Sequence, residues 1–315
     1  MNRIYLILLL LIITATPLWA ESPVPRVAVS IKPLHSLVSG VMQGVGKPDL
    51  VVKSGGSPHG YVLRPSEAQL LSRAQLVVWV GHELESFLEK PLATLGHKAM
   101  QLELSDELEP FLLSVRQGGG WESHAHKHEG EHMEDDHGHG DHQRTKPDLH
   151  LWLDPAMAKR IVTLTAKALT ELDPARQSQY QANAGQMNER LDQLDRRLKE
   201  KLGSVKEVPY IVFHAAYQYF ESAYGLNVVG SITLDPGRAP GAKKINEIHH
   251  KIKELNARCV FSEPQFESRL VATVIEGTNA RTGVLDPLGA DIPEGPDAYF
   301  QLMSRLGDSI YQGLK

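Results

Sequence analysis

Histidine is the residue type whose number and placement point most directly to chemistry in this sequence. The 315-residue chain contains 15 histidines and one cysteine, Cys259. Neutral imidazole is a good ligand for Zn²⁺, and also for Cu²⁺ and Ni²⁺. A lone cysteine can neither form a multi-cysteine metal site nor close a disulfide within its own chain. Any metal site must therefore depend on histidine and carboxylate ligands.

Of three further histidines, two lie where an α/β protein binds ligands. His59 lies in a glycine-rich turn after the apolar run Leu50–Lys53, and His214 directly follows the run Tyr210–Phe213. In open α/β sheets, ligands bind beyond the carboxyl ends of the strands. A third histidine, His150, lies between these two in the sequence. Taken singly, each is more often a structural residue, and spacing alone does not join the three in one site.

The segment Gln117–Lys146 is poor in apolar residues and rich in histidine and acid, so we expect a disordered loop. Ordering a mobile chain around a metal costs conformational entropy, so metal sites here should be auxiliary and weak. The alternative is a solvated tract without function. The seven histidines of the loop are His124, His126, His128, His132, His137, His139 and His142.

Part of this loop permits a different interpretation. His137–His142 matches the pattern HxHxDH of metallo-β-lactamase-type zinc hydrolases. Such a catalytic motif must be held by a packed core, whereas this copy lies in low-complexity sequence. A zinc hydrolase is therefore an alternative hypothesis, and a metal-storing or adhesive surface protein is another. The sequence His82–Ser86 does not complete the HExxH motif, because its second histidine is missing.

The elements that would position these residues alternate between strand and helix. Short β-branched runs recur, with helical patterns such as Ser66–Ser72 and Lys243–Leu255 between them. This alternation predicts an α/β fold with mostly parallel sheets flanked by helices. The expected strands are Val27–Ser30, Leu50–Lys53, Leu76–Val80, Tyr210–Phe213, Val228–Ile232 and Val260–Ser262.

One long amphipathic helix is expected over Asp173–Gly203, between the two strand-rich halves. Asp173 suits an N-cap, Pro174 suits the first turn, and Gly203 suits a C-terminal stop. We interpret this helix as a rigid connector, and the alternative is a helix packed inside one domain. Its apolar face is predicted to contain Tyr180, Ala184, Met187, Leu191, Leu194, Leu198 and Leu202.

The first twenty residues are expected to be a secretory signal peptide. Arg3 precedes an apolar run, Ile4–Ile13, and Ala20 suits the cleavage position. The alternative is an uncleaved anchor, although this run is shorter than the ~20 residues that span a bilayer. The chain has 33 Lys and Arg against 38 Asp and Glu, which does not suggest a nucleic-acid surface. We therefore expect a soluble, exported protein.

Several motifs, in order along the mature chain, resemble those of a known family. The sequence is similar to the zinc-binding periplasmic proteins of zinc ABC importers, the ZnuA type within the metal-binding cluster of substrate-binding proteins. An acidic, histidine-rich loop just before the His150 motif is also typical of the zinc branch. The matching segments are Gly56–Tyr61, Leu63–Ser66, Val77–Gly81, His150–Pro155, Val212–His214, Tyr217–Phe220, Phe261–Phe266 and Leu285–Gly289.

The resemblance implies a binding protein, not an enzyme, with two α/β lobes joined by one long helix and a metal in the cleft between them. It would be a periplasmic monomer that captures Zn²⁺ and delivers it to an ABC permease. The implied ligands are His59 and His150 from the N-terminal lobe and His214 from the C-terminal lobe, with Asp286 or water as the fourth. The expected lobes are residues 21–172 and 204–315, joined by residues 173–203.

Two positions depart from the pattern of the family. Some members have a glutamate just before the first histidine ligand, where this chain has Pro58. Some members also form a disulfide from the position of Cys259 to a cysteine near the C-terminus, where Gly313 stands here. The resemblance therefore implies that this chain lacks both that ligand and that bridge.

Overall fold

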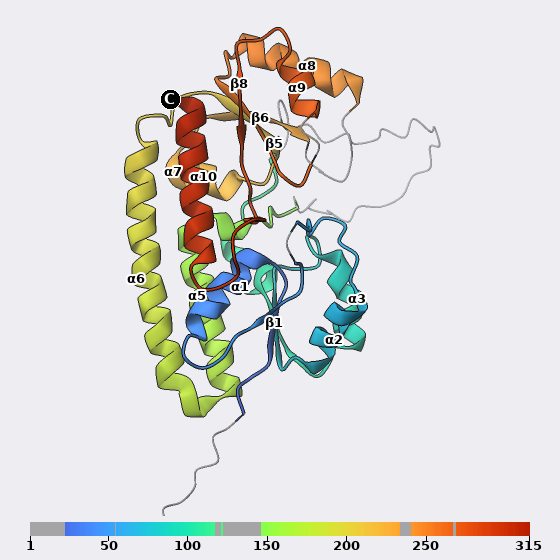
Figure 1. Cartoon of the computed structure of the whole chain (residues 1–315), viewed down its shortest axis with the longest axis vertical. Helices are drawn as coiled ribbons and strands as arrows, with labels where there is room; N and C mark the ends of the chain where they lie inside the picture. The colour runs from blue at the N-terminus through green and yellow to red at the C-terminus, as the bar shows by residue number, and fades with distance from the viewer. Residues whose placement is uncertain (1–22, 54, 117–120, 122–145, 234–240, 267–268) are drawn as a thin grey trace, which may run out of the picture.

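The computed structural model describes residues 23–53, 55–116, 121, 146–233, 241–266 and 269–315. The expected signal peptide, residues 1–20, and the seven histidines of the expected loop lie outside these residues. Within the described part of the chain, no helix is both long and apolar enough to cross a membrane. Figure 1 shows two lobes, one above the other, with the long helix α6 running along both.

The lower lobe in Figure 1 contains a four-stranded parallel sheet with the strand order β2-β1-β3-β4. Helices α1 and α5 cover one face and α2 and α3 cover the other, so β1 and β3 are apolar on both faces. The strands are β1 Val27–Val29, β2 Asp49–Leu50, β3 Leu76–Trp79 and β4 Met100–Glu103. The helices are α1 Lys32–Val41, α2 Pro65–Arg73, α3 Ser86–Thr94, α4 Leu104–Glu107 and α5 Pro155–Leu172, with 3₁₀ turns at Glu109–Phe111 and Leu151–Leu153.

The upper lobe repeats this arrangement with the strand order β6-β5-β7-β8, again all parallel. Helices α8 and α9 pack on one face, and α7 and α10 pack on the other. The strands are β5 Tyr210–His214, β6 Val228–Thr233, β7 Cys259–Ser262 and β8 Arg281–Val284. The helices are α7 Gln218–Tyr224, α8 Ala242–Glu254, α9 Arg269–Ile275 and α10 Ala298–Leu314.

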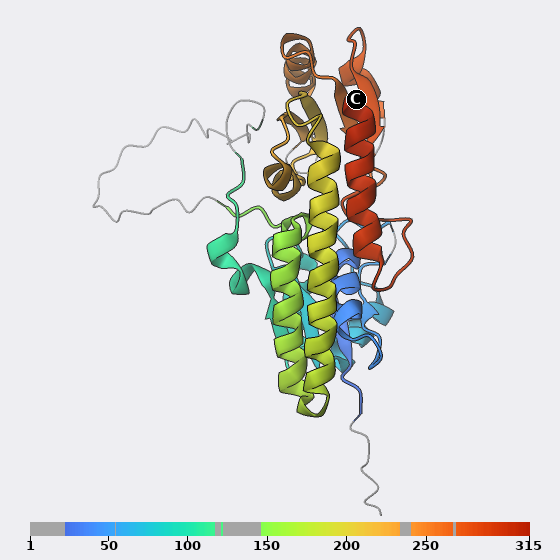
Figure 2. The same cartoon turned by 90° about the vertical axis from the view of Figure 1, so that its left-hand side faces the viewer.

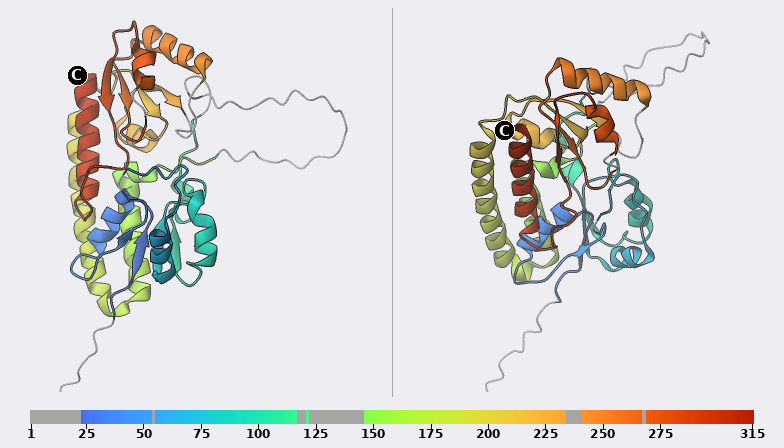
Figure 3. Two further views of the ribbon diagram at one scale, coloured as in Figure 1. Left: turned by 45° about the vertical axis from the view of Figure 1, so that its right-hand side comes forward. Right: turned by 45° about the horizontal axis from the view of Figure 1, so that its top comes forward.

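The two sheets direct their carboxyl ends toward the boundary between the lobes. In each sheet the strand order reverses beside the first strand, at β1 in the lower lobe and at β5 in the upper one. Such a switch point opens a crevice at the carboxyl ends of the strands. His59, in the segment after β2, and His214, the last residue of β5, approach each other here, with ring centroids 5.6 Å apart. Figure 3 (left) shows the connecting loops of both lobes meeting between the sheets.

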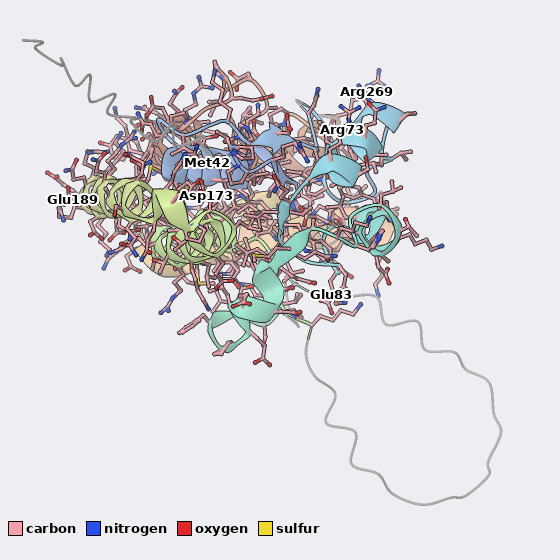
Figure 4. The ribbon with its side chains drawn as sticks, turned by 90° about the horizontal axis from the view of Figure 1, so that it is seen from below. Met42, Arg73, Glu83, Asp173, Glu189 and Arg269 are labelled. Atoms are coloured by element: carbon pink, nitrogen blue, oxygen red, sulfur yellow. The ribbon has the colours of Figure 1, made fainter. Side chains whose placement is uncertain are left out.

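Helix α6, Gln177–Leu202, packs along its whole length instead of crossing solvent. All seven residues of the predicted apolar face are buried. Two glycines allow neighbouring helices to approach it closely: a Cβ at Gly40 of α1 would lie 2.3 Å from Met187, and one at Gly307 of α10 would lie 2.4 Å from Leu198. Figure 2 shows α5, α6 and α10 side by side. Figure 4 shows α5 and α6 end on, with Asp173 between them and Met42 at the neighbouring end of α1.

The start of the long helix differs from the prediction. Pro174–Arg176 forms a separate 3₁₀ turn, and α6 begins only at Gln177. Asp173 does not act as its N-cap, because its carboxylate accepts hydrogen bonds from the side chains of Arg176 and Tyr180, both to Oδ2, at 2.8 and 2.9 Å. The helix of 26 residues is therefore about 39 Å long at ~1.5 Å per residue.

The predicted fold class, two parallel sheets flanked by helices with one long helix between the strand-rich halves, is confirmed. Two strands were missed, β4 and β8. Each lies at an edge of its sheet and carries exposed or half-buried positions, so neither has the continuous apolar run of a central strand. The lobe limits at residues 172 and 204 stay predictions.

Candidate metal site

His214 is placed by the central strands of the upper sheet. It ends β5, and Glu263 directly follows the neighbouring strand β7. Both side chains are buried, and His214 Nδ1 lies 2.6 Å from Glu263 Oε1. A carboxylate can only accept, so His214 Nδ1 carries the proton and donates it. The other ring nitrogen, Nε2, is left with a free lone pair.

His150 is oriented in the same way by a carboxylate that is close to it in the sequence. It precedes the 3₁₀ turn Leu151–Leu153, and Asp148 lies two residues before it. One oxygen, Asp148 Oδ1, lies 2.8 Å from His150 Nδ1 and accepts the backbone N–H of His150 at 3.0 Å. This pair of contacts fixes both the backbone and the ring, so Nε2 of His150 also points away from its carboxylate partner.

His59 comes from the loop that follows β2. Its backbone N–H donates to Ser57 Oγ at 3.2 Å, and the next residue, Gly60, has a φ of +84°. Glycine adopts that left-handed conformation far more readily than other residues, so Gly60 turns the chain sharply after His59. Burial, together with the imidazoles of His150 and His214, lowers the pKa of His59 to about 2. The ring of His59 is therefore neutral, as a metal ligand must be.

The three rings bring their Nε2 atoms together. The distance from His150 Nε2 is 3.2 Å to His59 Nε2 and 3.4 Å to His214 Nε2. Four ligands at Zn–N distances of about 2.0–2.1 Å in a tetrahedron lie about 3.3–3.4 Å apart. The imidazoles thus have the spacing of three corners of a zinc tetrahedron. Among the described residues, these histidines form the only group of three or more potential metal-ligating side chains whose ligand atoms all lie within 4.8 Å of one another.

The space at the centre is small and largely apolar. The cavity has a volume of about 10 Å³, enough for one ion or one water molecule. Trp152 and Phe266 line it together with Pro287 and Leu288. An apolar wall lowers the local dielectric constant, which strengthens the interaction of a bound cation with the carboxylates behind the imidazoles.

Asp286, expected as a possible fourth ligand, is engaged elsewhere. One of its oxygens, Oδ1, accepts from Gln265 Nε2 at 2.8 Å and from the N–H groups of Leu288 and Gly289 at 3.0 Å each. The other, Oδ2, accepts the N–H of Ala290 at 2.6 Å. Asp286 is not part of the histidine group and instead holds the turn that follows it. Its role as a ligand stays a prediction.

Asp148 and Glu263 are further candidate site residues that the sequence analysis does not single out. Their signal in the sequence is weak: Asp148 is two residues from a candidate ligand, and Glu263 follows an expected strand. Glu263 is 49 positions away from His214, so only the pairing of β5 with β7 reveals their contact. The seven loop histidines lie outside the described residues, so their auxiliary role stays a prediction.

Two α/β lobes with three imidazoles between them define a two-lobed metal-binding protein. Comparison with known proteins narrows this class. The sequence profile of the family described as "Zinc-uptake complex component A periplasmic" matches residues 27–313. The chain therefore belongs to this family, as its motifs had indicated.

One curated relative and two solved structures illustrate the similarity. The "High-affinity zinc uptake system protein ZnuA" of Brucella abortus (strain 2308) is 50% identical over 305 residues, which cover 90% of both chains. A crystal structure of ZnuA superposes with a TM-score of 0.76 at 23% identity, over 93% of this chain and 100% of that one. The laminin-binding protein Lmb of Streptococcus agalactiae superposes with a TM-score of 0.74 at 23% identity, over 92% of this chain and 100% of the other. At such identities the two structures establish the fold alone.

Proposed function

We propose that this protein captures Zn²⁺ outside the cytoplasm and delivers it to the permease of an ABC importer for zinc uptake. Membership of the zinc-uptake family, and a 50% identical relative named for high-affinity zinc uptake, support this function over the hydrolase alternative. The observation that carries the proposal is the convergence of three Nε2 atoms at tetrahedral spacing. The protein binds and hands over its metal rather than catalysing a reaction.

The ligand set explains a preference for zinc over the harder cations. Three neutral imidazoles suit Zn²⁺, whereas Mg²⁺ and Ca²⁺ require oxygen ligands. Asp148 and Glu263 together add a formal charge of −2 behind the rings, which offsets the +2 charge of the ion. We propose that a water molecule occupies the fourth position, because the carboxylate of Asp286 is occupied by Gln265 and by three backbone amides.

The first test is the affinity of single variants for zinc. In His214→Ala the two remaining imidazoles cannot complete the tetrahedron, so affinity should fall by more than the roughly 10- to 100-fold typical of losing an outer-shell partner. A titration against a competing chelator measures this, and His97→Ala is the matched control because His97 is exposed and outside the site. Wild-type affinity in His214→Ala would refute the proposed site.

The second test addresses transport. A strain that lacks this protein should grow poorly in zinc-depleted medium, and the intact protein should restore growth. The variant with His59, His150 and His214 all changed to Ala should not restore it. Full rescue by that variant would show that the site is not the one used for uptake.

A further inference from the structure

A buried lysine of the lower lobe is bound to the upper lobe beside the metal site. Lys32 begins α1 directly after β1, and it is only 6% exposed. Its Nζ donates to the carbonyl oxygens of Gly289 at 2.7 Å, Ala290 at 2.9 Å and Ile292 at 2.9 Å. An ammonium group has three N–H donors, and all three are used on this one segment. We refer to residues 286–292, which follow β8, as the 286–292 loop.

The 286–292 loop forms one wall of the histidine site. Pro287 and Leu288 line the same small cavity as the three imidazoles. The indole Nε1 of Trp152 donates to the carbonyl oxygen of Pro287 at 2.8 Å, and the Trp152 ring lies 5.4 Å from the ring of His150. The loop is thus held on one side by Lys32 and on the other by a residue packed against a metal ligand.

The charges around the loop favour one position for it. The carboxylate of Asp286 accepts hydrogen bonds from the N–H groups of three loop residues, while the ammonium of Lys32 donates hydrogen bonds to carbonyl oxygens of the same turn. If the loop moved away, the ammonium of Lys32 would lose its three carbonyl partners, and a buried charge without hydrogen-bond partners is costly. Movement of the loop therefore requires the bonds to Lys32 to break together.

We propose that Lys32 is a positioning residue that fixes the 286–292 loop against the metal site and thereby sets the rate at which zinc leaves. This inference rests on the proposed function, because it concerns release of the same ion. The ion lies between the two lobes, and the loop closes one side of its cavity. Zinc escapes when the loop lifts, and a permease that displaces the loop would accelerate release without altering the histidines.

The test is the zinc dissociation rate of Lys32→Met, measured by stopped flow with an excess of a chromogenic chelator. Loss of three charge-assisted hydrogen bonds should raise the dissociation rate by about 10- to 100-fold. The association rate should change much less, because the ligands keep their positions. Lys167→Met, a change of an exposed lysine on α5, is the matched control and should release zinc at the wild-type rate.

A second variant keeps the inference testable if Lys32→Met does not fold. Trp152→Phe keeps an aromatic ring but removes the bond to Pro287, so it should release zinc faster than wild type. A folded Lys32→Met protein with the wild-type dissociation rate would overturn the inference, and so would an unchanged rate in Trp152→Phe. Failure of the unmodified protein to bind zinc would refute the proposed function instead, so the two failures are distinguishable.

Discussion

Two carboxylates orient two of the histidines in the candidate metal site. Asp148 and Glu263 each hold the Nδ1–H of an imidazole, so that the Nε2 lone pairs of His150 and His214 face the same point. Such outer partners fix the tautomer and raise the basicity of a ligand, and their loss typically lowers metal affinity. The geometry thus assigns part of the affinity to residues that do not touch the metal.

Glu263→Gln tests this assignment. The amide keeps the shape of the side chain but removes the negative charge behind His214, so zinc affinity should fall by about 10- to 100-fold. Chelator competition measures the change, and Glu207→Gln serves as the control because Glu207 is 85% exposed. A Glu263→Gln protein that binds zinc as tightly as the wild type would show that the carboxylate is dispensable.

His59 should make the metal-free protein sensitive to acid. Its pKa is lowered to about 2 in the folded state, against ~6.5 in an unfolded chain. Between these values the unfolded state binds a proton that the folded state does not, so stability falls as the pH drops below about 6.5. From pH 7 to pH 5 this should cost about 1–2 kcal/mol, measured by denaturant unfolding.

The variant His59→Gln should lose less stability than the metal-free wild type over the same pH range, because it lacks the titrating group. If the stability of both proteins depended equally on pH, the acid sensitivity would come from other residues. Zinc-loaded wild type should resist the fall down to a lower pH, because bound metal competes with protons for the imidazoles.

The three histidines were predictable from sequence, whereas most of their supporting contacts were not. His59 and His214 follow recognisable strands, and the family motifs added His150. Lys32, in contrast, meets the carbonyl of Gly289 across 257 positions of sequence, and nothing local marks it as an interlobe residue. For Asp286, the motif that suggests a possible ligand does not reveal that backbone amides donate to both of its oxygens, and its role as a ligand stays a prediction.

The two segments that flank the histidine-rich tract are hydrogen-bonded to each other. The backbone N–H of Val115 donates to the carbonyl of Lys146 at 2.9 Å, and that of Asp148 donates to the carbonyl of Leu113 at 2.7 Å. The hydroxyl of Tyr219, on α7, accepts from the N–H of Leu113 and donates to the carbonyl of Asp148, both at 2.9 Å. The chain that precedes His150 is therefore anchored to the upper lobe independently of residues 117–145.

Replacing residues 117–145 with a short Gly/Ser linker should leave the fold and the tight zinc site intact, because the paired segments 113–115 and 146–148 on either side have their own contacts. Calorimetry with chelator competition should show that weak additional sites disappear and that one tight site remains. The melting temperature of the metal-free protein serves as the folding control. Loss of the tight site from a folded protein would place the principal ligands in the removed segment.

The two strands that were not predicted, β4 and β8, show what a continuous apolar run can reveal in a sequence. The central strands β1, β3, β5 and β7 are covered by helices on both faces, and their apolar runs were recognisable in the sequence. The edge strands β4 and β8 carry polar residues on exposed positions and were missed. The rule that failed is the requirement for a continuous apolar run, which applies only to strands buried on both faces.

Contacts on more than one side of the candidate metal site join the two lobes of the molecule. Helix α6 packs against α1 of the lower lobe and against α10, which lies beside it and runs up to the C-terminus (Figure 2). Lys32 and Trp152 hold the 286–292 loop, and Tyr219 binds the paired segments 113–115 and 146–148 before His150. With these ties in place, we expect zinc to bind and leave through small local movements instead of a wide hinge opening.

The position of the metal itself tests the proposal most directly. Crystals of the zinc-loaded protein should be measured at the zinc absorption edge, so that anomalous scattering locates the ion. We expect one strong peak at about 2.0–2.1 Å from the Nε2 atoms of His59, His150 and His214, with a water molecule as the fourth ligand. A principal zinc peak elsewhere in the molecule, with these three imidazoles unoccupied, would contradict it.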